Sequence, residues 1–412
     1  MDRMGRFHFC SAKIQELGKK ETIYEKPELF SNQPRGRPMT FCRFALYLAF
    51  ALVIVFPTPL RAADTIKIGI AGAHSGDLAS YGLPTVRATE LVVKGINARG
   101  GINGRQVELL IEDDVCKPEI ATNIATKLIS MGARVVIGHI CSGATKAALP
   151  IYRDAGVIVI SPSATNADLT LNGDYPNFYR TIFADNIQAR TIVDFTVREL
   201  RAKKIAVIHD KGDYGKGLAE FAKTFVEENK TVELVLYEGV TPGAVDYSAV
   251  VQKIKRSGAD AVIYGGYHPE ASKIVTQMRK KKMGTAFVSD DGVKDDTFIK
   301  VAGAFAEGVY ATGPVDVSAN SLGRSAREAH RQEYGTEPGA FFDNAYAAAL
   351  VLTNALAKAG GTDAEAMARV LHTEDVETPF GAFHFDRNGD ATGTTLSMFR
   401  VENGRYVPIK QP

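Results

Sequence analysis

A cysteine and a serine stand where an apolar segment gives way to a helix-like one, within the stretch RVVIGHICSGATKAA at residues 134–148. Residues 135–140 predict a buried strand, and Cys141 and Ser142 follow it directly. A helix that begins at Ser142 would present free N–H groups and the positive end of its dipole, which together favour a carboxylate. The stretch therefore predicts either an ordinary helix cap or a site for a small anion.

Polar and aromatic side chains follow other apolar segments in the same way. In open sheets of parallel strands, ligands bind beyond the carboxyl ends of the strands, so these side chains are expected to face one site. The residues concerned are Tyr81, Ser142, Ser163, Thr165, Tyr214, Tyr267, Asp290 and Asp291. The hydroxyl groups suit a carboxylate, the aspartates suit an ammonium group and the tyrosines could enclose an apolar side chain. Each residue alone is equally well explained as a cap, turn or rim residue, but the set together fits an α-amino acid.

Signatures of enzymes are missing from the sequence. No G-x-G-x-x-G or G-x-x-x-x-G-K-[ST] loop follows the first apolar segment, and no G-x-S-x-G motif occurs. Four histidines near predicted strand ends share no ligand spacing, so structural hydrogen bonds explain them better: His74, His139, His209 and His268. Residues 386–397 half-resemble a calcium loop but lack glycine at the sixth and glutamate at the twelfth position, which favours a hairpin turn. We therefore expect no catalytic residue, no metal and no cofactor.

The elements that must position these residues alternate between strand and helix. Apolar, strand-like segments lie at residues 65–72, 106–114, 135–140, 156–165, 203–210, 231–240, 259–267, 285–292 and 307–314. Helix-like segments separate them, at residues 83–98, 117–132, from 142 onward, 216–230, 247–257 and 269–283. Strands that are apolar throughout and alternate with helices predict parallel sheets covered on both faces. Because the series restarts after residue 185, the pattern predicts an α/β protein with two lobes.

The remaining chain contains one long apolar helix and a terminal group of strands. Residues 339–360 form the Ala-rich helical segment, which is expected to be packed on both sides. The segment after it alternates like antiparallel strands, with turns expected at Asn388–Gly389 and Asn403–Gly404.

The first 63 residues are expected to be absent from the folded protein. Residues 44–60 are apolar, follow Arg43 and precede the small pair Ala62 and Ala63, as in a cleaved signal peptide. Met39 would be an ordinary start for it, which leaves residues 1–38 as a mis-assigned start or a genuine extension. An uncleaved membrane anchor is less well supported, because Pro57 interrupts a run that is short for a span. The mature chain then begins near Asp64.

Charge and cysteine content narrow the class of protein further. The whole chain carries a net charge of +2, and from residue 64 onward it has 39 basic and 42 acidic residues, which argues against a nucleic-acid partner. Cys10 and Cys42 leave with the leader, so only Cys116 and Cys141 remain. An even count in an exported chain suggests one disulfide, which would stabilise by about 3 kcal/mol in the chain-entropy account, and two buried thiols are the alternative.

The chain resembles the leucine/isoleucine/valine-binding proteins of bacterial ABC importers. Long collinear motifs carry the resemblance across residues 64–407, including SGDLASYG, GGINGRQVELLIEDD, IGHICSGATKAALPIY, SPSATNADLT, VIHDKGDYGKGLA and YGGYHPEA. The resemblance implies a type I periplasmic-binding-protein fold, in which two Rossmann-like lobes are joined by three crossovers and hold the ligand between them. It places residues 64–183 and 313–392 in the N-terminal lobe, and residues 184–312 and 393–412 in the C-terminal lobe.

The resemblance assigns the carboxylate end of the site to the first lobe. Ser142 matches the serine that grips the ligand carboxylate at the helix start, and Thr165 matches the threonine of the next strand end. Ser163 stands where relatives often have alanine and use a backbone carbonyl. Cys116 and Cys141 match the disulfide of the family, which would fix the strand end next to Ser142.

The resemblance assigns the remaining contacts to both lobes. Tyr214 matches a second-lobe tyrosine near the polar end of the ligand, and Tyr81 and Tyr267 match aromatics around its side chain. Asp291 stands where branched-chain members usually carry glutamate, so the charge for ammonium pairing is kept while the carboxylate is one methylene shorter. That difference alters the pocket dimensions on which exact specificity depends.

These observations predict a non-enzymatic, monomeric protein of the periplasm that captures leucine, isoleucine or valine. The resemblance implies that the closed form delivers the amino acid to an inner-membrane ABC permease powered by an ATPase. Two alternatives are a ligand-sensing module that docks to a separate receptor, and a binder of another amino acid or an amide.

Overall fold

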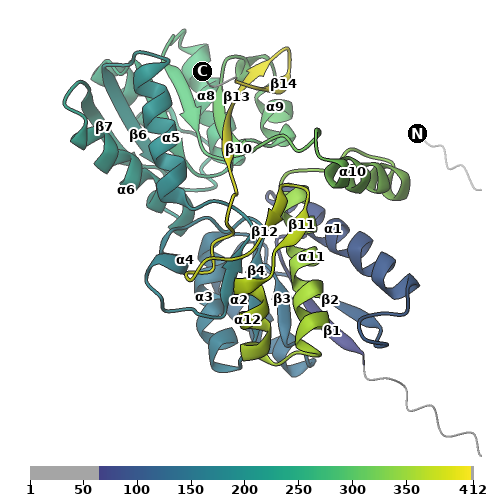
Figure 1. The fold of residues 1–412 in the computed structure, drawn as a ribbon. Coiled ribbons are helices and arrows are strands. Elements are labelled where there is room, and N and C mark those ends of the chain that lie inside the picture. Colours follow the sequence, from purple (N-terminus) through teal and green to yellow (C-terminus); the bar gives the residue numbers. More distant parts are fainter. Residues whose placement is uncertain (1–64, 410–412) are drawn as a thin grey trace, which may run out of the picture. The chain divides into compact units, whose positions relative to one another are not determined.

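The structure is a computed structural model that describes residues 65–409. The predicted extension and signal peptide at residues 1–63, with their start at Met39, lie outside the described residues, as do Cys10, Cys42 and residues 410–412. Among residues 65–409, no helix has the length and apolar character that crossing a bilayer requires. This part of the chain forms two main sheets, each flanked by helices on both faces (Figure 1).

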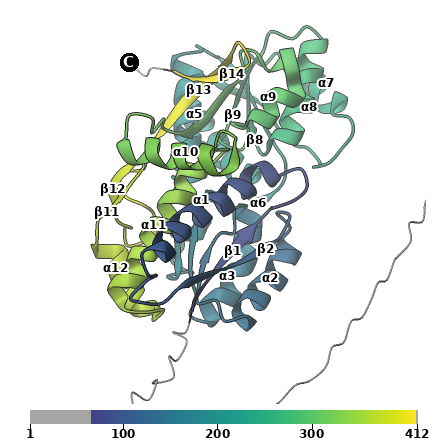
Figure 2. The ribbon, with the colours of Figure 1, turned by 90° about the vertical axis from the view of Figure 1, so that its right-hand side faces the viewer.

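The first sheet consists of five parallel strands in the order β2–β1–β3–β4–β5. Its strands are β1 (Ile66–Gly72), β2 (Val107–Asp113), β3 (Val135–Ile137), β4 (Ile158–Ser161) and β5 (Phe178–Arg180). The helices on one face are α1 (Ala79–Ala98), α11 (Phe342–Ala359) and α12 (Ala364–Thr373), and those on the other are α2 (Pro118–Ser130) and α3 (Ser142–Asp154). Helices α1 and α11 lie side by side on their face (Figure 2).

The second sheet has seven strands in the order β14–β13–β10–β9–β8–β6–β7. Its parallel strands are β6 (Lys204–His209), β7 (Glu233–Gly239), β8 (Ala261–Gly265), β9 (Ala286–Ser289) and β10 (Tyr310–Pro314). Strand β13 (Leu396–Glu402) pairs antiparallel with β10, and β14 (Arg405–Pro408) pairs antiparallel with β13. Helices α5 (Asp185–Arg198) and α6 (Asp213–Glu228) cover one face, and α7 (Ser248–Ser257), α8 (His268–Lys280) and α9 (Asp296–Ala302) cover the other.

Smaller elements complete the described residues. They are α4 (Asp168–Leu171), the 3-10 helix η1 (Gly303–Ala306), α10 (Ser321–Tyr334) and the hairpin of β11 (Val376–Thr378) and β12 (Gly381–Phe383).

The strands divide their apolar side chains between the two faces of each sheet. In β3, Val135 and Ile137 pack toward α1, α11 and α12, whereas Val136 packs toward α2 and α3. All three are fully buried. This two-sided burial explains why the strands are apolar at every position rather than at alternate ones.

The chain passes between the two sheets three times: after β5, after β10 and before β13 (Figure 1). The lobe boundaries expected at residues 183/184 and 392/393 lie within the first and third of these passages. The boundary expected at 312/313 falls inside β10, where Gly313 still pairs with Ser397 of the second sheet. That crossover therefore follows Pro314, and the exact residue bounds of the lobes remain a prediction.

Several element boundaries differ from those that the sequence pattern predicts. Strand β3 ends at Ile137 rather than at residue 140, because Gly138 turns the chain away with φ +124°. A Cβ atom at Gly138 would collide with the carbonyl oxygen of Ala71, so only glycine fits there. Helix α1 begins at Ala79 rather than at residue 83, with Pro84 inside it. The predicted turn at Asn403–Gly404 is confirmed, since both residues have positive φ and connect β13 to β14.

Candidate ligand-binding site

Both main sheets contain a point at which the order of strands reverses. In the first sheet this point lies between β1 and β3, and in the second it lies between β6 and β8. Crevices at such points are where open α/β sheets bind ligands. The segments that follow these strands supply most of the residues around one cavity.

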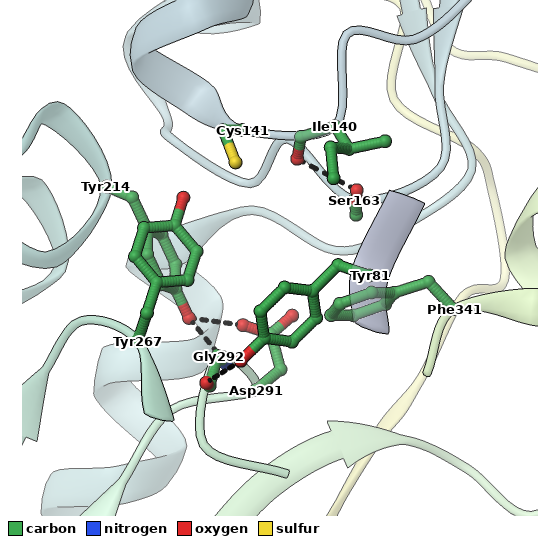
Figure 3. A pocket seen from close by; sticks show the side chains of 9 residues that line it. All are labelled: Tyr81, Ile140, Cys141, Ser163, Tyr214, Tyr267, Asp291, Gly292 and Phe341. Atoms are coloured by element: carbon green, nitrogen blue, oxygen red, sulfur yellow. Dashed lines mark hydrogen bonds between the residues drawn. The ribbon is translucent and has the colours of Figure 1, made fainter. Parts of the chain in front are cut away.

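That cavity comprises about 270 Å³ of space between the side chains, part of which is continuous with solvent. Figure 3 shows its nine lining residues, which are Tyr81, Ile140, Cys141, Ser163, Tyr214, Tyr267, Asp291, Gly292 and Phe341. Seven residues were assigned to the site by the family resemblance, and five of them line the cavity directly: Tyr81, Ser163, Tyr214, Tyr267 and Asp291. The other two, Ser142 and Thr165, are buried but do not line the cavity. Ser142 directly follows the lining residue Cys141, and Thr165 lies two positions after the lining residue Ser163.

Ser142 is the first residue of α3 and is not its cap, since the extended residue before the helix is Cys141. The Ser142 hydroxyl accepts a hydrogen bond from the backbone N–H of Asn166, at 3.2 Å. It therefore links the start of α3 to the segment that follows β4. Thr165 lies in that segment, where its carbonyl accepts from the backbone N–H of Asp185 at 2.8 Å and its hydroxyl lies beside the Asp185 carboxyl group.

The segment before Ser142 is fixed by a disulfide and by a buried polar network. Cys116 and Cys141 form the disulfide, with their Cα atoms 5.5 Å apart. His139 is fully buried and its Nδ1 lies 2.5 Å from the Asp114 carboxylate, while its Nε2 lies 3.1 Å from the Tyr152 hydroxyl. These contacts hold the lining residue Cys141 and the start of α3 in one position.

The opposite side of the cavity is acidic. Asp291 is 2% exposed, and its Oδ1 accepts hydrogen bonds from the Tyr214 hydroxyl and from Gln188 Nε2. Its other oxygen, Oδ2, is buried without a hydrogen-bond partner. Asp290 does not line the cavity, because its carboxylate accepts from Gly266 N and Ser289 Oγ, as a turn residue would.

Burial raises the pKa of each carboxyl group in this acidic cluster. The pKa of Asp291 rises to about 6, because burial outweighs the hydrogen bonds donated by Tyr214 and Gln188. Burial, with the negative charge of Asp291, raises the pKa of Asp185 to about 8. The pKa of Asp290 is raised well above its usual value by burial and by Asp291. As the pH rises, Asp291 is therefore expected to ionise before Asp185.

Aromatic rings form the apolar wall of the cavity and bring the lobes into contact. The Tyr81 ring centroid lies 5.9 Å from that of Tyr267 and 5.9 Å from that of Phe341, and Tyr214 lies 5.1 Å from Tyr267. The Tyr81 hydroxyl donates to the carbonyl of Gly292 at 2.6 Å. Since Tyr81 follows a strand of the first sheet and Gly292 follows a strand of the second, this hydrogen bond connects segments of the two sheets.

Four residues around the site were not expected from the sequence. Phe341 lines the cavity from a left-handed backbone conformation just before α11, which no local pattern indicates. Asp185 and Gln188 are fully buried on the first two turns of α5, and an acidic residue at a helix start was the only available signal for either. His268 was expected to make a structural hydrogen bond, and its Nδ1 lies 2.5 Å from the Tyr81 hydroxyl.

The segment that half-resembles a calcium loop was predicted to form a hairpin turn instead. The predicted hairpin turn at residues 386–390 is present, with Asp386 accepting from the backbone N–H groups of Asn388 and Asp390. Within residues 65–409, no group of three or more potential ligands is arranged to hold a metal ion.

Comparison with known proteins places the chain among binding proteins. The sequence profile of the periplasmic binding protein family matches residues 65–405. A leucine-, isoleucine-, valine-, threonine- and alanine-binding protein of Pseudomonas aeruginosa is 35% identical over 357 residues, covering 87% of this chain and 95% of that protein. A Leu/Ile/Val-binding protein of Escherichia coli is 33% identical over 352 residues, covering 85% and 95%.

A solved structure supports the same comparison. The branched-chain amino acid transporter substrate-binding protein of Streptococcus pneumoniae, in complex with isoleucine, is 32% identical to this chain with a TM-score of 0.75. The match covers 84% of this chain and all of that one. The expected two-lobe α/β fold is thereby confirmed.

Proposed function

This chain belongs to the periplasmic binding protein family, within the group of leucine/isoleucine/valine-binding proteins, and we propose that it captures one branched-chain amino acid between its lobes. Membership of this family confirms that the chain is a binding protein rather than an enzyme. The ligand would be delivered to a branched-chain amino acid ABC transporter.

The observation that carries the proposal is the acidic side of the cavity. A buried carboxylate oxygen without a partner is costly, and Asp291 Oδ2 is such an oxygen beside a lining of aromatic rings. An ammonium group would supply the missing partner and match the negative charge of the Asp291 carboxylate. The start of α3 at Ser142 offers the complementary site for the ligand carboxylate, and the tyrosines and Phe341 suit an aliphatic side chain.

Closure of the lobes follows from how these contacts are divided. The open protein would bind the amino acid first through Ser142 and Thr165 of the first lobe. The second lobe would then add Tyr214, Tyr267 and Asp291, and only those added contacts favour the closed state over the open one.

The cellular setting forms part of the same proposal. Residues 39–63 would direct export and be removed, leaving a monomer in the periplasm that begins near Asp64. The closed form would dock to a permease in the inner membrane, and an ATPase would drive transport. Family membership supports this setting, whereas the leader itself lies outside the described residues.

A thermal-shift screen of the common L-amino acids and short amides tests the choice of ligand. A ligand at a hundred times its dissociation constant should stabilise by about 2.7 kcal/mol, which raises the melting temperature visibly. We expect the largest rise with leucine, isoleucine or valine. A rise in melting temperature with only another small zwitterion would show that the protein is specific for that compound rather than for a branched-chain amino acid. No rise with any of them would contradict amino-acid capture.

Affinity for L-leucine is expected to fall in acid. Since the pKa of Asp291 is about 6 in the ligand-free protein, the carboxyl group is charged above this pH and protonated below it. The ligand ammonium group prefers the charged form of Asp291. The affinity for leucine is therefore highest well above pH 6 and falls as the pH drops through this value. Linkage predicts a dissociation constant about tenfold higher at pH 5 than at pH 7. Calorimetric titration at both values measures this, and a slope unchanged by Asp291→Asn would rule out Asp291 as its source.

A further inference from the structure

Gln188 is a fully buried residue near the start of α5, a helix that covers one face of the second sheet. Its side-chain amide makes four hydrogen bonds. Oε1 accepts from the backbone N–H of Asp291 at 2.8 Å and from the Thr312 hydroxyl, while Nε2 donates to Asp291 Oδ1 and Asp185 Oδ1, both at 3.3 Å. An amide has two donors and one oxygen with two lone pairs, so the bonding capacity of Gln188 is fully used.

Two of these four hydrogen bonds join Gln188 to one residue of the cavity, Asp291. Gln188 holds Asp291 twice, once through its backbone and once through its carboxylate, although the two residues are 103 positions apart. The bond from Thr312 ties the same amide to β10, the strand that leads into the second crossover. The Asp291 carboxylate can therefore rotate little, and its unpartnered oxygen stays directed away from both donors to its Oδ1.

We propose that Gln188 is a positioning residue that orients Asp291 toward the ammonium group of the ligand and keeps its carboxyl group ionised. This inference rests on the proposed function. Gln188 itself does not line the cavity, so its effect on the ligand would pass through Asp291.

Electrostatics around the pair support this role. Gln188 offers two N–H groups to a cluster that holds three buried carboxyl groups, and each donated bond favours the charged form of its acceptor. The hydrogen bond from Gln188 lowers the pKa of Asp291 against the opposing effect of burial, and it does the same for Asp185. Besides its own three carboxyl groups, the titratable and charged groups that face this cluster are Tyr81, Arg180, Asp210, Tyr214, Tyr267 and Lys294.

The variant Gln188→Met tests the proposal, because methionine is similar in size and can neither donate nor accept as an amide does. We expect L-leucine to bind about 10- to 100-fold more weakly. Binding of 4-methylpentanoate, which is leucine without its ammonium group, should change little. We also expect the pH at which leucine affinity is lost to move upward by about one unit.

Matched variants separate this role from a general loss of stability. Thr196→Val removes a hydroxyl that is equally buried on the same helix but donates only to the Ile192 carbonyl, so leucine affinity should stay at the parental value. In an Asp291→Asn background, adding Gln188→Met should weaken leucine binding no further, since the two residues act as one unit. Gln188→Glu keeps the acceptor oxygen but loses the donors and should also weaken leucine binding.

A measurement without ligand distinguishes this inference from the proposed function. Carbon-13 NMR titration of the aspartate carboxyl groups should show a higher midpoint for Asp291 in Gln188→Met than in the parent protein. If the parent fails to bind leucine, the proposed function is wrong and the titration still decides the role of Gln188. An unchanged midpoint, or equal losses of leucine and 4-methylpentanoate binding, would overturn the inference.

Discussion

Replacing Asp291 with alanine is expected to weaken L-leucine binding by about 3–5 kcal/mol, which corresponds to roughly 150- to 4,000-fold. The variant would leave the ligand ammonium without the carboxylate that faces it, because Asp291 is the acidic residue among those that line the cavity. Removing one member of a buried pair costs more than the pair contributes, since the remaining charge is desolvated without compensation. Fluorescence or calorimetric titration at pH 7.5 measures the loss.

The adjacent aspartate supplies the control for this experiment. Asp290 is also fully buried, but its carboxyl group accepts from the Gly266 N–H and does not line the cavity. Asparagine can accept the same bond, so Asp290→Asn should bind leucine within a few-fold of the parent protein. A binding curve of Asp291→Ala that overlays the parental curve would remove Asp291 from the site.

Replacing Arg180 with methionine is expected to lower the free energy of unfolding by about 3–5 kcal/mol. Arg180 is fully buried at the end of β5, where its guanidinium pairs with Asp390 and donates to the carbonyls of Thr165 and Asn166 at 3.0 and 2.7 Å. The substitution would remove a charged donor from both carbonyls and from the Asp390 carboxylate, and the hydrogen bonds that remain to them come from neutral groups. Because Thr165 belongs to the carboxylate side of the site, the same arginine supports both the fold and the binding segment.

Urea unfolding measures this loss of stability, and a surface arginine provides the control. Arg153 pairs with Asp154 at 3.1 Å, but both side chains are largely exposed, so Arg153→Met should change the unfolding free energy by less than about 0.5 kcal/mol. The double variant Arg180→Met with Asp390→Asn should recover part of the loss, since it removes the unpaired charge. A cost below 1 kcal/mol for Arg180→Met alone would show that water or a neighbouring group satisfies the carbonyls.

The sequence was sufficient to predict the sheets and the side of the sheets that carries the site. Central strands buried on both faces are largely apolar, so β1, β3, β4, β6, β8 and β9 stand out as apolar runs between helices, whereas the edge strands β2 and β7 also carry acidic residues. Because the carboxyl ends of parallel strands gather at one edge, residues such as Ser163 and Tyr267 could be assigned to one cavity before any contact was known.

Other parts of the site depend on contacts that leave no local pattern. Helix α5 was not expected, because its buried face includes the polar residues Asp185 and Gln188, and Gln188 bonds to Asp291, which lies 103 residues away. Phe341 reaches the cavity from a backbone conformation that is uncommon for a bulky residue, so its position depends on packing against Tyr81. Pairings of this kind follow from the tertiary fold and not from propensity or periodicity.

The most direct test of the account is a calorimetric titration of the purified protein at pH 7.5 with three probes: L-leucine, leucinamide and 4-methylpentanoate. If one zwitterion is held by the start of α3 at its carboxylate and by Asp291 at its ammonium group, one leucine should bind per chain. Leucinamide and 4-methylpentanoate, which each lack one of these charges, should then bind at least about a hundred-fold more weakly. Leucine that binds no better than either analogue would contradict recognition of both charged ends, and with it the assignment of this cavity.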